Sequence, residues 1–236
     1  LIYRSRKEPV VIVSPILQHS PSVLITLKKN TIDNPYELNK KNILFYKNDI
    51  DGMGILAMLN SLDIKPNISR IKQGNDYNLL INGEVDAYTG YITNEPFYIK
   101  ENNIDINIIN PANYGFDFYG DMLFTNEFEA QNYPNRVQRF KEATIKGWQY
   151  SLENKEETIK LIKSKYAKNK SLKHLRYEAD ALEQLIQHKS IPIGTIDRGR
   201  LSYITEVYKK YGLVDNTILQ KDYIFQNDHQ NKKILI

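Results

Sequence analysis

The chain has 236 residues, of which 32 are basic and 28 acidic, and its formal net charge is +4. A chain of this length can form one large domain or two small lobes, each with its own core. Lysines are scattered among the acids rather than gathered on one face, a pattern that disfavours a nucleic-acid partner. The absence of cysteine excludes disulfides, thiolate metal sites and cysteine nucleophiles, and it fits a periplasmic protein.

Targeting signals are not visible in the sequence. No apolar run approaches the roughly 18–20 residues that a membrane-spanning helix needs, and no signal peptide is recognisable. Since the chain opens on Leu1 rather than on Met, we expect it to be a piece of a longer protein. A periplasmic or extracytoplasmic location, with any membrane anchor in absent segments, is therefore compatible with the sequence.

In the first half of the chain, short β-branched and aromatic runs alternate with polar turns. They predict a buried parallel strand over 10–17 and further strands over 22–27, 43–46, 67–71, 85–91, 104–109 and 122–125. Helical patterns stand between these runs, over 35–38, 53–62, 76–81 and 95–101. This alternation predicts open α/β sheets flanked by helices.

After Pro134 the sequence becomes mostly helical. Amphipathic patterns predict helices from 134 onward and over 156–166, 172–187 and 198–211. A sheet-forming middle followed by a helical return predicts two lobes joined by crossing strands, which we place at 22–27 and 122–125. Lobe one would comprise 1–27 and 121–236, incomplete at its start, and lobe two would comprise 28–120.

The stretch over 83–126 is the most informative about function. Aromatic rings alternate there with acids and amides, at predicted strand ends and tight turns, and no nucleophile–base pair or metal-ligand cluster accompanies them. Rings can stack on the faces of a small, flat, polar molecule while carboxylates and amides bond its edge. The pattern indicates recognition rather than turnover.

Four short motifs carry a family resemblance. They are ILQHSP at 16–21, YxTNEP at 91–96, PxxYG followed by FYGD within 111–121, and RFxxATxxGWxY at 139–150. Together they resemble the type 2 periplasmic substrate-binding proteins that bind or make the thiamine pyrimidine precursor. That group is related to the alkanesulfonate and taurine receptors of ABC transporters.

The resemblance implies a two-lobed clamp that closes on one small planar heterocycle, without a cofactor, a metal ion or a catalytic residue. It implies as partner an ABC permease or, where such domains serve as extracytoplasmic sensors, a fused kinase or cyclase output domain. The chain departs from the family in lacking the opening part of lobe one, where some of the family's ligand contacts lie.

Glu95 and Asn94 stand at the start of a predicted helix. The resemblance makes Glu95 an acceptor for a ligand amine or ring N–H, whereas a carboxylate near a helix N-terminus can also serve only the helix dipole. Asn94 can contact ligand or cap the helix. Tyr88 and Tyr91 differ by three, so on a regular strand at most one lines the cleft, and Tyr91 is favoured.

Asn48, Asp49 and Asp51 precede another predicted helix start, which could bind an anion through its backbone N–H groups. The two carboxylates argue against a sulfonate or phosphate and for a neutral or amine-bearing ligand. Helix capping is the alternative role for all three side chains.

The remaining candidates lie at the first crossover and among the glycines of the aromatic stretch. Gln18, His19 and Ser20 could reach a ligand, although a lone histidine at a hinge is often satisfied by backbone groups. Tyr114 and Tyr119 flank Gly115 and Gly120, where backbone can approach closely, and each can be a core residue or a ring wall.

The sequence leaves three functional hypotheses. The first is a small-molecule receptor, either a transporter subunit or the ligand-sensing domain of a membrane receptor. The second is a pyrimidine-precursor synthase of the same fold, whose chemistry needs a cysteine-bearing cluster that this chain lacks. The third is a purely partner-binding module.

Overall fold

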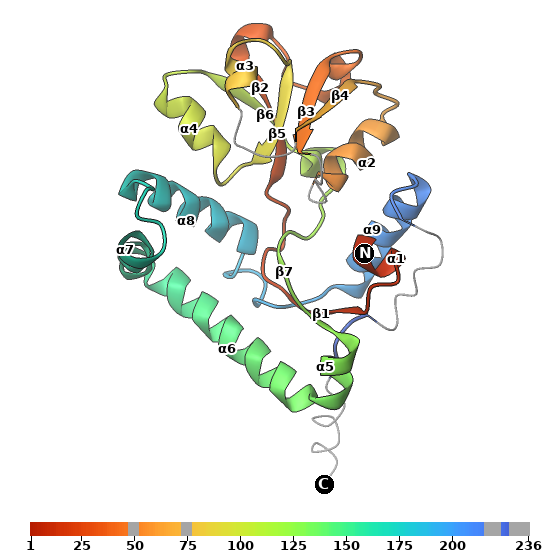
Figure 1. Cartoon of the computed structure of the whole chain (residues 1–236), viewed down its shortest axis with the longest axis vertical. Helices are drawn as coiled ribbons and strands as arrows, with labels where there is room; N and C mark the ends of the chain where they lie inside the picture. The colour runs from red at the N-terminus through yellow and green to blue at the C-terminus, as the bar shows by residue number, and fades with distance from the viewer. Residues whose placement is uncertain (47–51, 72–76, 215–222, 227–236) are drawn as a thin grey trace. The chain divides into compact units, whose positions relative to one another are not determined.

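The computed structural model describes residues 1–46, 52–71, 77–214 and 223–226. The chain forms two compact units (Figure 1). Unit 1 comprises Leu1–Gln18, Tyr119–Asn154 and Ile186–Ile236, and unit 2 comprises His19–Phe118 and Lys155–Leu185. The observed boundaries differ from the prediction, since the chain enters unit 2 at His19 rather than at residue 28, and 155–185 group with unit 2 rather than with the first lobe.

Unit 2 contains a five-stranded sheet with the order β4-β3-β5-β2-β6. Its strands are β2 (Ser22–Leu27), β3 (Asn42–Tyr46), β4 (Asn67–Ile71), β5 (Ala87–Tyr91) and β6 (Ile106–Ile109). β3 runs parallel to β4 and β5, whereas β2 runs antiparallel to β5 and β6. The carboxyl ends of β3, β4, β5 and β6 therefore meet the start of β2 at one edge of the sheet.

β2 is buried along its whole length, and Val23, Leu24 and Ile25 have no exposed surface. A strand with apolar side chains on both faces must lie inside a covered sheet. The sequence correctly predicted a strand at this position, but its assignment as a crossover was wrong because β2 lies within the sheet of unit 2.

Short helices cover the sheet of unit 2. They are α2 (Met53–Ser61), α3 (Asn78–Ile81) and α4 (Glu95–Glu101), with the 3-10 turns η1 (Lys28–Asn30), η2 (Pro35–Leu38) and η3 (Pro111–Tyr114). Side chains from β2, β3, β5, α3 and α4 form one hydrophobic cluster, which includes Ile25, Leu44 and Tyr88. Asn34 accepts the Tyr36 N–H and so caps η2, as its position before Pro35 predicts.

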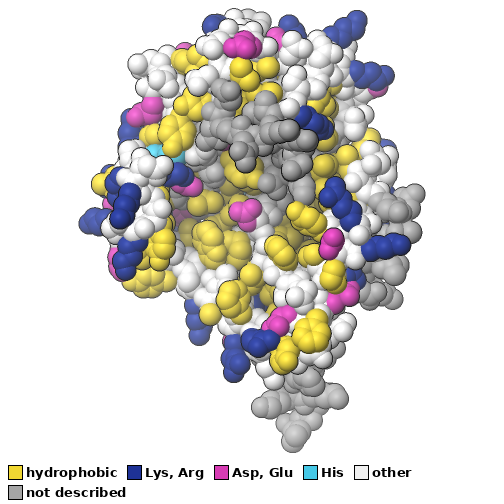
Figure 2. Space-filling view, in the orientation of Figure 1, with side chains coloured by type: hydrophobic (Ala, Val, Ile, Leu, Met, Phe, Trp, Pro, Cys, Tyr) yellow, Lys and Arg dark blue, Asp and Glu magenta, His cyan; other side chains and the backbone are white. Residues whose placement is uncertain are grey.

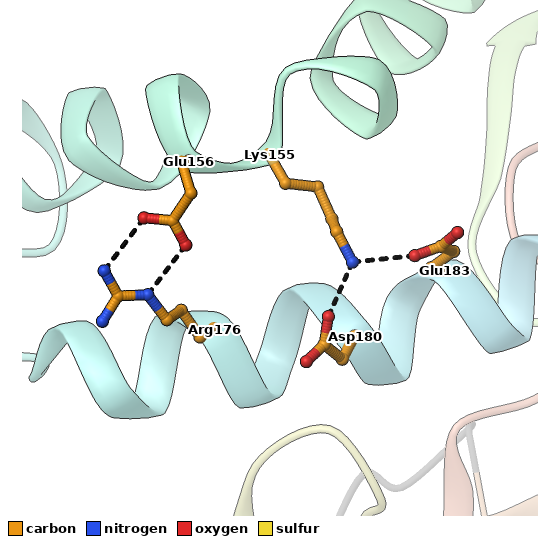
Figure 3. Close-up of polar contacts among 5 residues, drawn as sticks. All are labelled: Lys155, Glu156, Arg176, Asp180 and Glu183. Atoms are coloured by element: carbon orange, nitrogen blue, oxygen red, sulfur yellow. Dashed lines mark hydrogen bonds and ion pairs between the residues drawn. The ribbon is translucent and has the colours of Figure 1, made fainter.

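The hairpin of α7 (Lys155–Lys165) and α8 (Leu172–Ile186) also belongs to unit 2. Figure 3 shows its two ion-pair groups. Lys155 Nζ lies 2.6 Å from Asp180 and 2.8 Å from Glu183, and these carboxylates, Asp180 first, raise the pKa of the amine. Arg176 donates to both oxygens of Glu156, at 2.7 and 2.9 Å.

Unit 1 has a two-stranded sheet of β1 (Val10–Pro15) and β7 (Met122–Asn126). Its helices are α1 (Ile2–Ser5), α5 (Glu127–Asn132), α6 (Pro134–Glu153) and α9 (Arg198–Lys210). β1 pairs with β7 in the antiparallel sense, with a bulge between Ile12 and Ser14, and within the described residues its parallel pairing is limited to the isolated bridge of Ile12 to Ile224. The predicted parallel strand is therefore wrong for the pairing with β7. A β-branched run indicates burial, but the direction of its neighbour depends on a distant segment.

Two glycines of unit 1 give a test of the backbone geometry. Gly194 has φ +90°, and a Cβ there would lie 2.5 Å from Ser14 Oγ and 2.9 Å from Ile145 Cδ1. We expect Gly194→Ala to lower the free energy of unfolding by about 1–3 kcal/mol because of strain and overlap. Gly147, inside α6, has nothing within 4 Å of such a Cβ. Gly147→Ala should therefore raise stability by about 0.5–1 kcal/mol.

Urea denaturation of the two variants beside the parent chain checks this pair. Equal stabilities for the two alanine variants would contradict the conformation assigned to Gly194.

Candidate functional site

Loops at one edge of the unit 2 sheet bring together six of the twelve predicted site residues. His19 and Ser20 precede β2, and its first residue, Ser22, lies opposite Tyr91 at the end of β5. The other candidates follow the carboxyl ends of β5 and β6: Tyr91, Asn94, Glu95 and Tyr114. In open α/β sheets, ligands bind outside the carboxyl ends of the strands. The topology thus collects this group where such a sheet offers a site.

Glu95 is the first residue of α4 and is 5% exposed. Its Oε2 accepts the Tyr91 N–H at 2.7 Å, and its Oε1 accepts from Asn94 Nδ2 at 3.1 Å. Gly90 makes room for it, because a Cβ at that position would lie 3.0 Å from Oε2. The carboxylate therefore holds the turn between β5 and α4 in place, and its contact with a ligand stays a prediction.

Asn94 occupies the N-cap position of α4, but its side chain makes no capping hydrogen bond. It donates to the Glu95 carboxylate instead. The Asn94 side chain therefore does not cap α4, which was one of its two predicted roles.

His19 pairs with a residue that the sequence did not single out. Its Nδ1 lies 2.7 Å from Asp117 Oδ1, and its backbone N–H donates to Leu185 O at 3.1 Å. Asp117 stands between Phe116 and Phe118, whose rings pack edge to face with centroids 6.3 Å apart. In the sequence, an acid flanked by two aromatic residues was the pattern that could have indicated a carboxylate held in one position.

The two β5 tyrosines point to opposite faces of the sheet, as the spacing of three predicts. Tyr88 lies opposite Ile25 in the hydrophobic cluster and is 1% exposed, so its ring belongs to the core rather than to an open surface. Tyr91 is half-buried at the end of the strand. Tyr114 is half-buried in η3, which ends at Gly115 in the left-handed conformation, φ 88°.

Two of the predicted residues lie outside unit 2. Gln18 and Tyr119 belong to unit 1, where Gln18 Nε2 donates to Thr195 O at 3.2 Å. The Tyr119 hydroxyl accepts the Asp197 N–H at 2.9 Å, and the Arg200 guanidinium stacks on its ring at 4.4 Å. Both side chains thus contact the segment that leads into α9. Asn48, Asp49 and Asp51 lie outside the described residues.

α8 braces the turn that carries Glu95. The Tyr177 hydroxyl donates to Ile92 O at 2.7 Å, and the His174 ring stacks on Phe97 of α4 with centroids 4.6 Å apart. His174 is 1% exposed, and neither ring nitrogen has a hydrogen-bond partner in the described part of the chain. Burial lowers the pKa of this imidazole, and Lys170 lowers it further, while Glu178 and Glu95 oppose the shift.

The sequence analysis assigned His174 no role in the site. The spacing of His174 and Tyr177, one helical turn apart on an amphipathic pattern, was the signal for their shared contact with another element. Among the described residues no three His, Cys, Asp or Glu side chains gather to hold a metal ion. Within the same ranges, no helix has the length and apolar character to cross a membrane.

Comparison with known proteins gives the family. The family model described as "NMT1/THI5 like" matches residues 1–158. The chain belongs to the NMT1/THI5-like family. This confirms the resemblance read from the four motifs.

A formylaminopyrimidine-binding protein from Halalkalibacterium halodurans is a relative of this NMT1/THI5-like chain. It is 29% identical over 85 residues, which are 35% of this chain and 26% of the relative. The matched part thus spans about a quarter of the length of that curated relative.

Two solved structures show the fold. The alkanesulfonate-binding protein SsuA from Xanthomonas axonopodis pv. citri, bound to MOPS, matches with a TM-score of 0.73 at 11% identity, over 96% of this chain and 77% of its own. The periplasmic aliphatic sulphonate-binding protein SsuA from Escherichia coli matches with 0.70 at 13% identity, over 95% and 72%. The predicted fold, α/β and like that of type 2 periplasmic binding proteins, is confirmed.

The buried imidazole predicts an acid-sensitive stability for this NMT1/THI5-like chain. In the unfolded chain His174 titrates near its usual pKa of about 6.5, whereas the folded pKa is lower. Its contribution is therefore complete above about pH 6.5 and is lost as the pH falls through the folded pKa. We expect His174→Phe, which keeps a stacking ring, to reduce the fall in melting temperature between about pH 7.5 and 5.5.

Thermal melts across that range are the measurement, with His188→Asn as the control at another histidine. An unchanged pH dependence in His174→Phe would exclude His174 as the titrating group.

Proposed function

We propose that this protein is an extracytoplasmic, non-catalytic receptor for a small planar heterocycle of the aminopyrimidine class. The observation that carries the proposal is the gathering of half-buried tyrosines, amides and carboxylates at one edge of the unit 2 sheet. Membership of the NMT1/THI5-like family and the periplasmic-binding-protein fold support it. The formylaminopyrimidine-binding relative supports the class of ligand.

The electrostatics of the edge favour an amine over a sulfonate. Glu95 and Asp117 place carboxylates among the loops that follow β5 and β6, and a carboxylate repels a sulfonate while it accepts from an amine or ring N–H. Tyr91 and Tyr114 supply rings that can stack on a flat ligand. The MOPS-bound relative shares the fold at 11% identity. This similarity does not extend to the ligand, so MOPS binding is a property of the relative alone.

As the biological context we propose delivery of the ligand to an ABC permease, in the periplasm or an equivalent extracytoplasmic space. The alternative within the same class is the sensor domain of a membrane receptor with a kinase or cyclase output. The pyrimidine-precursor synthase is the alternative from another class. It is disfavoured because its chemistry needs a cysteine-bearing cluster and the chain has no cysteine.

Ligand-dependent melting tests the proposal on the natural full-length protein. A formylaminopyrimidine should raise the melting temperature, because a ligand that binds only the folded state stabilises it by about 2.7 kcal/mol at 100 times its Kd. MOPS serves as the matched sulfonate probe and should leave the melting temperature unchanged. Stabilisation by MOPS alone would overturn the pyrimidine assignment.

Glu95 allows a sharper test of the site. We expect Glu95→Gln to weaken binding of the formylaminopyrimidine roughly ten- to a hundredfold, or about 1.5–3 kcal/mol, if its carboxylate bonds a ligand N–H. Calorimetric titration measures the change. Glu101→Gln is the control, since it neutralises an exposed carboxylate at the other end of α4, where the partner is Lys173 at 2.6 Å.

A purely structural Glu95 gives the opposite pair of results. The Glu95→Gln variant would then melt at a lower temperature, through the weakened bond to the Tyr91 N–H, and would bind the pyrimidine with the parent's affinity. That outcome would remove Glu95 from the site.

A further inference from the structure

The loop end of the α7–α8 hairpin gathers positive charge. Residues 160–173, which run from the second half of α7 to the start of α8, contain six lysines and no acidic residue. These lysines are Lys160, Lys163, Lys165, Lys168, Lys170 and Lys173. Without them the net charge of +4 would be negative. The scatter of lysines among acids that the sequence as a whole indicates therefore does not hold at 160–173, which we call the basic tip.

The hairpin separates charge along its length. The acids that pair with Lys155 and Arg176 lie toward its other end (Figure 3), and Figure 2 shows Lys and Arg side chains gathered over α7. A helix dipole favours lysines near the C-terminus of α7. It disfavours Lys173, because the first turn of α8 contains no acid to offset that charge. The helix dipoles alone therefore do not explain the basic tip.

Ion pairs neutralise only part of the charge of the basic tip. Lys170 pairs with Glu178 at 2.9 Å. Lys173 pairs with Glu101 at 2.6 Å. The other four lysines of the tip form no ion pair with any residue that the structure describes. The exposed members of that group are Lys160, Lys165 and Lys168. Their charges are therefore open to a partner from outside the chain.

Lys163 and Ser171 hold the turn of the basic tip in shape. Lys163 Nζ donates to the carbonyl oxygens of Lys168 and Lys170, at 2.6 and 2.8 Å. Ser171 Oγ accepts the His174 N–H at 3.0 Å, as the side chain of an N-cap residue does. The exposed lysines thus project from a turn that hydrogen bonds hold on both sides.

Apolar side chains are interspersed with these exposed lysines. Tyr166 is 78% exposed, and Leu161 and Leu172 are 46% and 38% exposed. Tyr166 directly follows Lys165. Tyrosine is enriched at membrane–water interfaces, and the lysine stem can lie along apolar surface while its ammonium group stays in water. Lysines mixed with exposed tyrosine and leucine are typical of a surface that rests on a lipid bilayer.

We propose that the basic tip is a contact surface for an anionic lipid bilayer. Charge complementarity carries the proposal, because clustered lysines are attracted to acidic headgroups. The residue types favour a bilayer over an acidic protein or a nucleic acid. The tip contains no arginine, which protein interfaces and base-reading sites prefer, and lysine is depleted from protein interfaces.

The consequence goes beyond the proposed receptor function. A receptor with this surface would work against the membrane rather than free in solution, whichever ligand it carries. The bilayer contact is therefore independent of Glu95 and of the pyrimidine assignment, and it can be tested without a ligand.

Vesicle flotation tests the proposal on the natural full-length protein, freed of any lipid anchor. The probes are vesicles of phosphatidylcholine alone and vesicles that also contain about 30% phosphatidylglycerol. The tip variant combines Lys160→Gln, Lys165→Gln and Lys168→Gln. The control variant makes the same change of charge at exposed lysines elsewhere in unit 2, and it combines Lys28→Gln, Lys29→Gln and Lys100→Gln.

We expect the parent protein and the control variant to bind the anionic vesicles at low salt, and to leave the neutral vesicles. The tip variant should bind the anionic vesicles about thirty- to a hundredfold more weakly, because three attractive charges are lost. High salt should weaken binding of the parent, since it screens those charges. In Tyr166→Trp, anionic vesicles should shift the added tryptophan emission to the blue, measured as a difference from the parent, as the ring enters the interface.

Three outcomes would overturn the proposal. The first is that the parent does not bind the anionic vesicles, and the second is that the tip and control variants bind them equally. The third is tighter binding of polyglutamate than of the vesicles, lost in the tip variant, which would assign the tip to an acidic protein. If thermal melts show that the tip variant does not fold, Lys168→Gln alone, in the loop between the helices, decides the question with an expected loss of about three- to fivefold.

Discussion

The placement of β2 between β5 and β6 is the constraint on which the rest of unit 2 depends. This strand runs against both neighbours and pairs Ser22 with Tyr91 and Leu24 with Ile109. Because its register is fixed by burial on both faces, the segment before β2 and the turns after β5 and β6 must lie together. The candidate ligand loops are thus a consequence of core packing, and the apolar sequence of β2 determines where they meet.

The α7–α8 hairpin is held by two kinds of contact, ion pairs between its helices and aromatic contacts of α8 with the rest of unit 2. The Lys155–Asp180 and Arg176–Glu156 pairs between the two helices lie largely at the surface, so each contributes little stability. α8 also contacts the rest of unit 2 through the buried His174 and the half-buried Tyr177. These two side chains tie the hairpin to the turn that carries Glu95.

Local patterns predicted the elements well and their partners poorly. β2, β4 and α4 have the bounds that the sequence indicates, because apolar runs and cap residues act over a few positions. The antiparallel direction of β1 and the assignment of α7 and α8 to unit 2 depend on contacts far apart in sequence. The pairing of His19 with Asp117, 98 residues apart, has the same origin. Tyr88 and Tyr91 show the limit clearly: their opposite faces follow from strand geometry, but which face is the core does not.

Gly90 and Glu95 form a pair whose evolution must be linked. The glycine leaves the space that the carboxylate occupies, since a Cβ there would lie 3.0 Å from Oε2 and 3.3 Å from Glu95 Cβ. A larger residue at position 90 alone would displace the Glu95 carboxylate. A shorter acid at position 95 would leave space for that larger residue. The two substitutions should therefore be non-additive, with each altering the cost of the other. In homologous sequences, the size of the residue at position 90 should therefore limit which acid position 95 can hold.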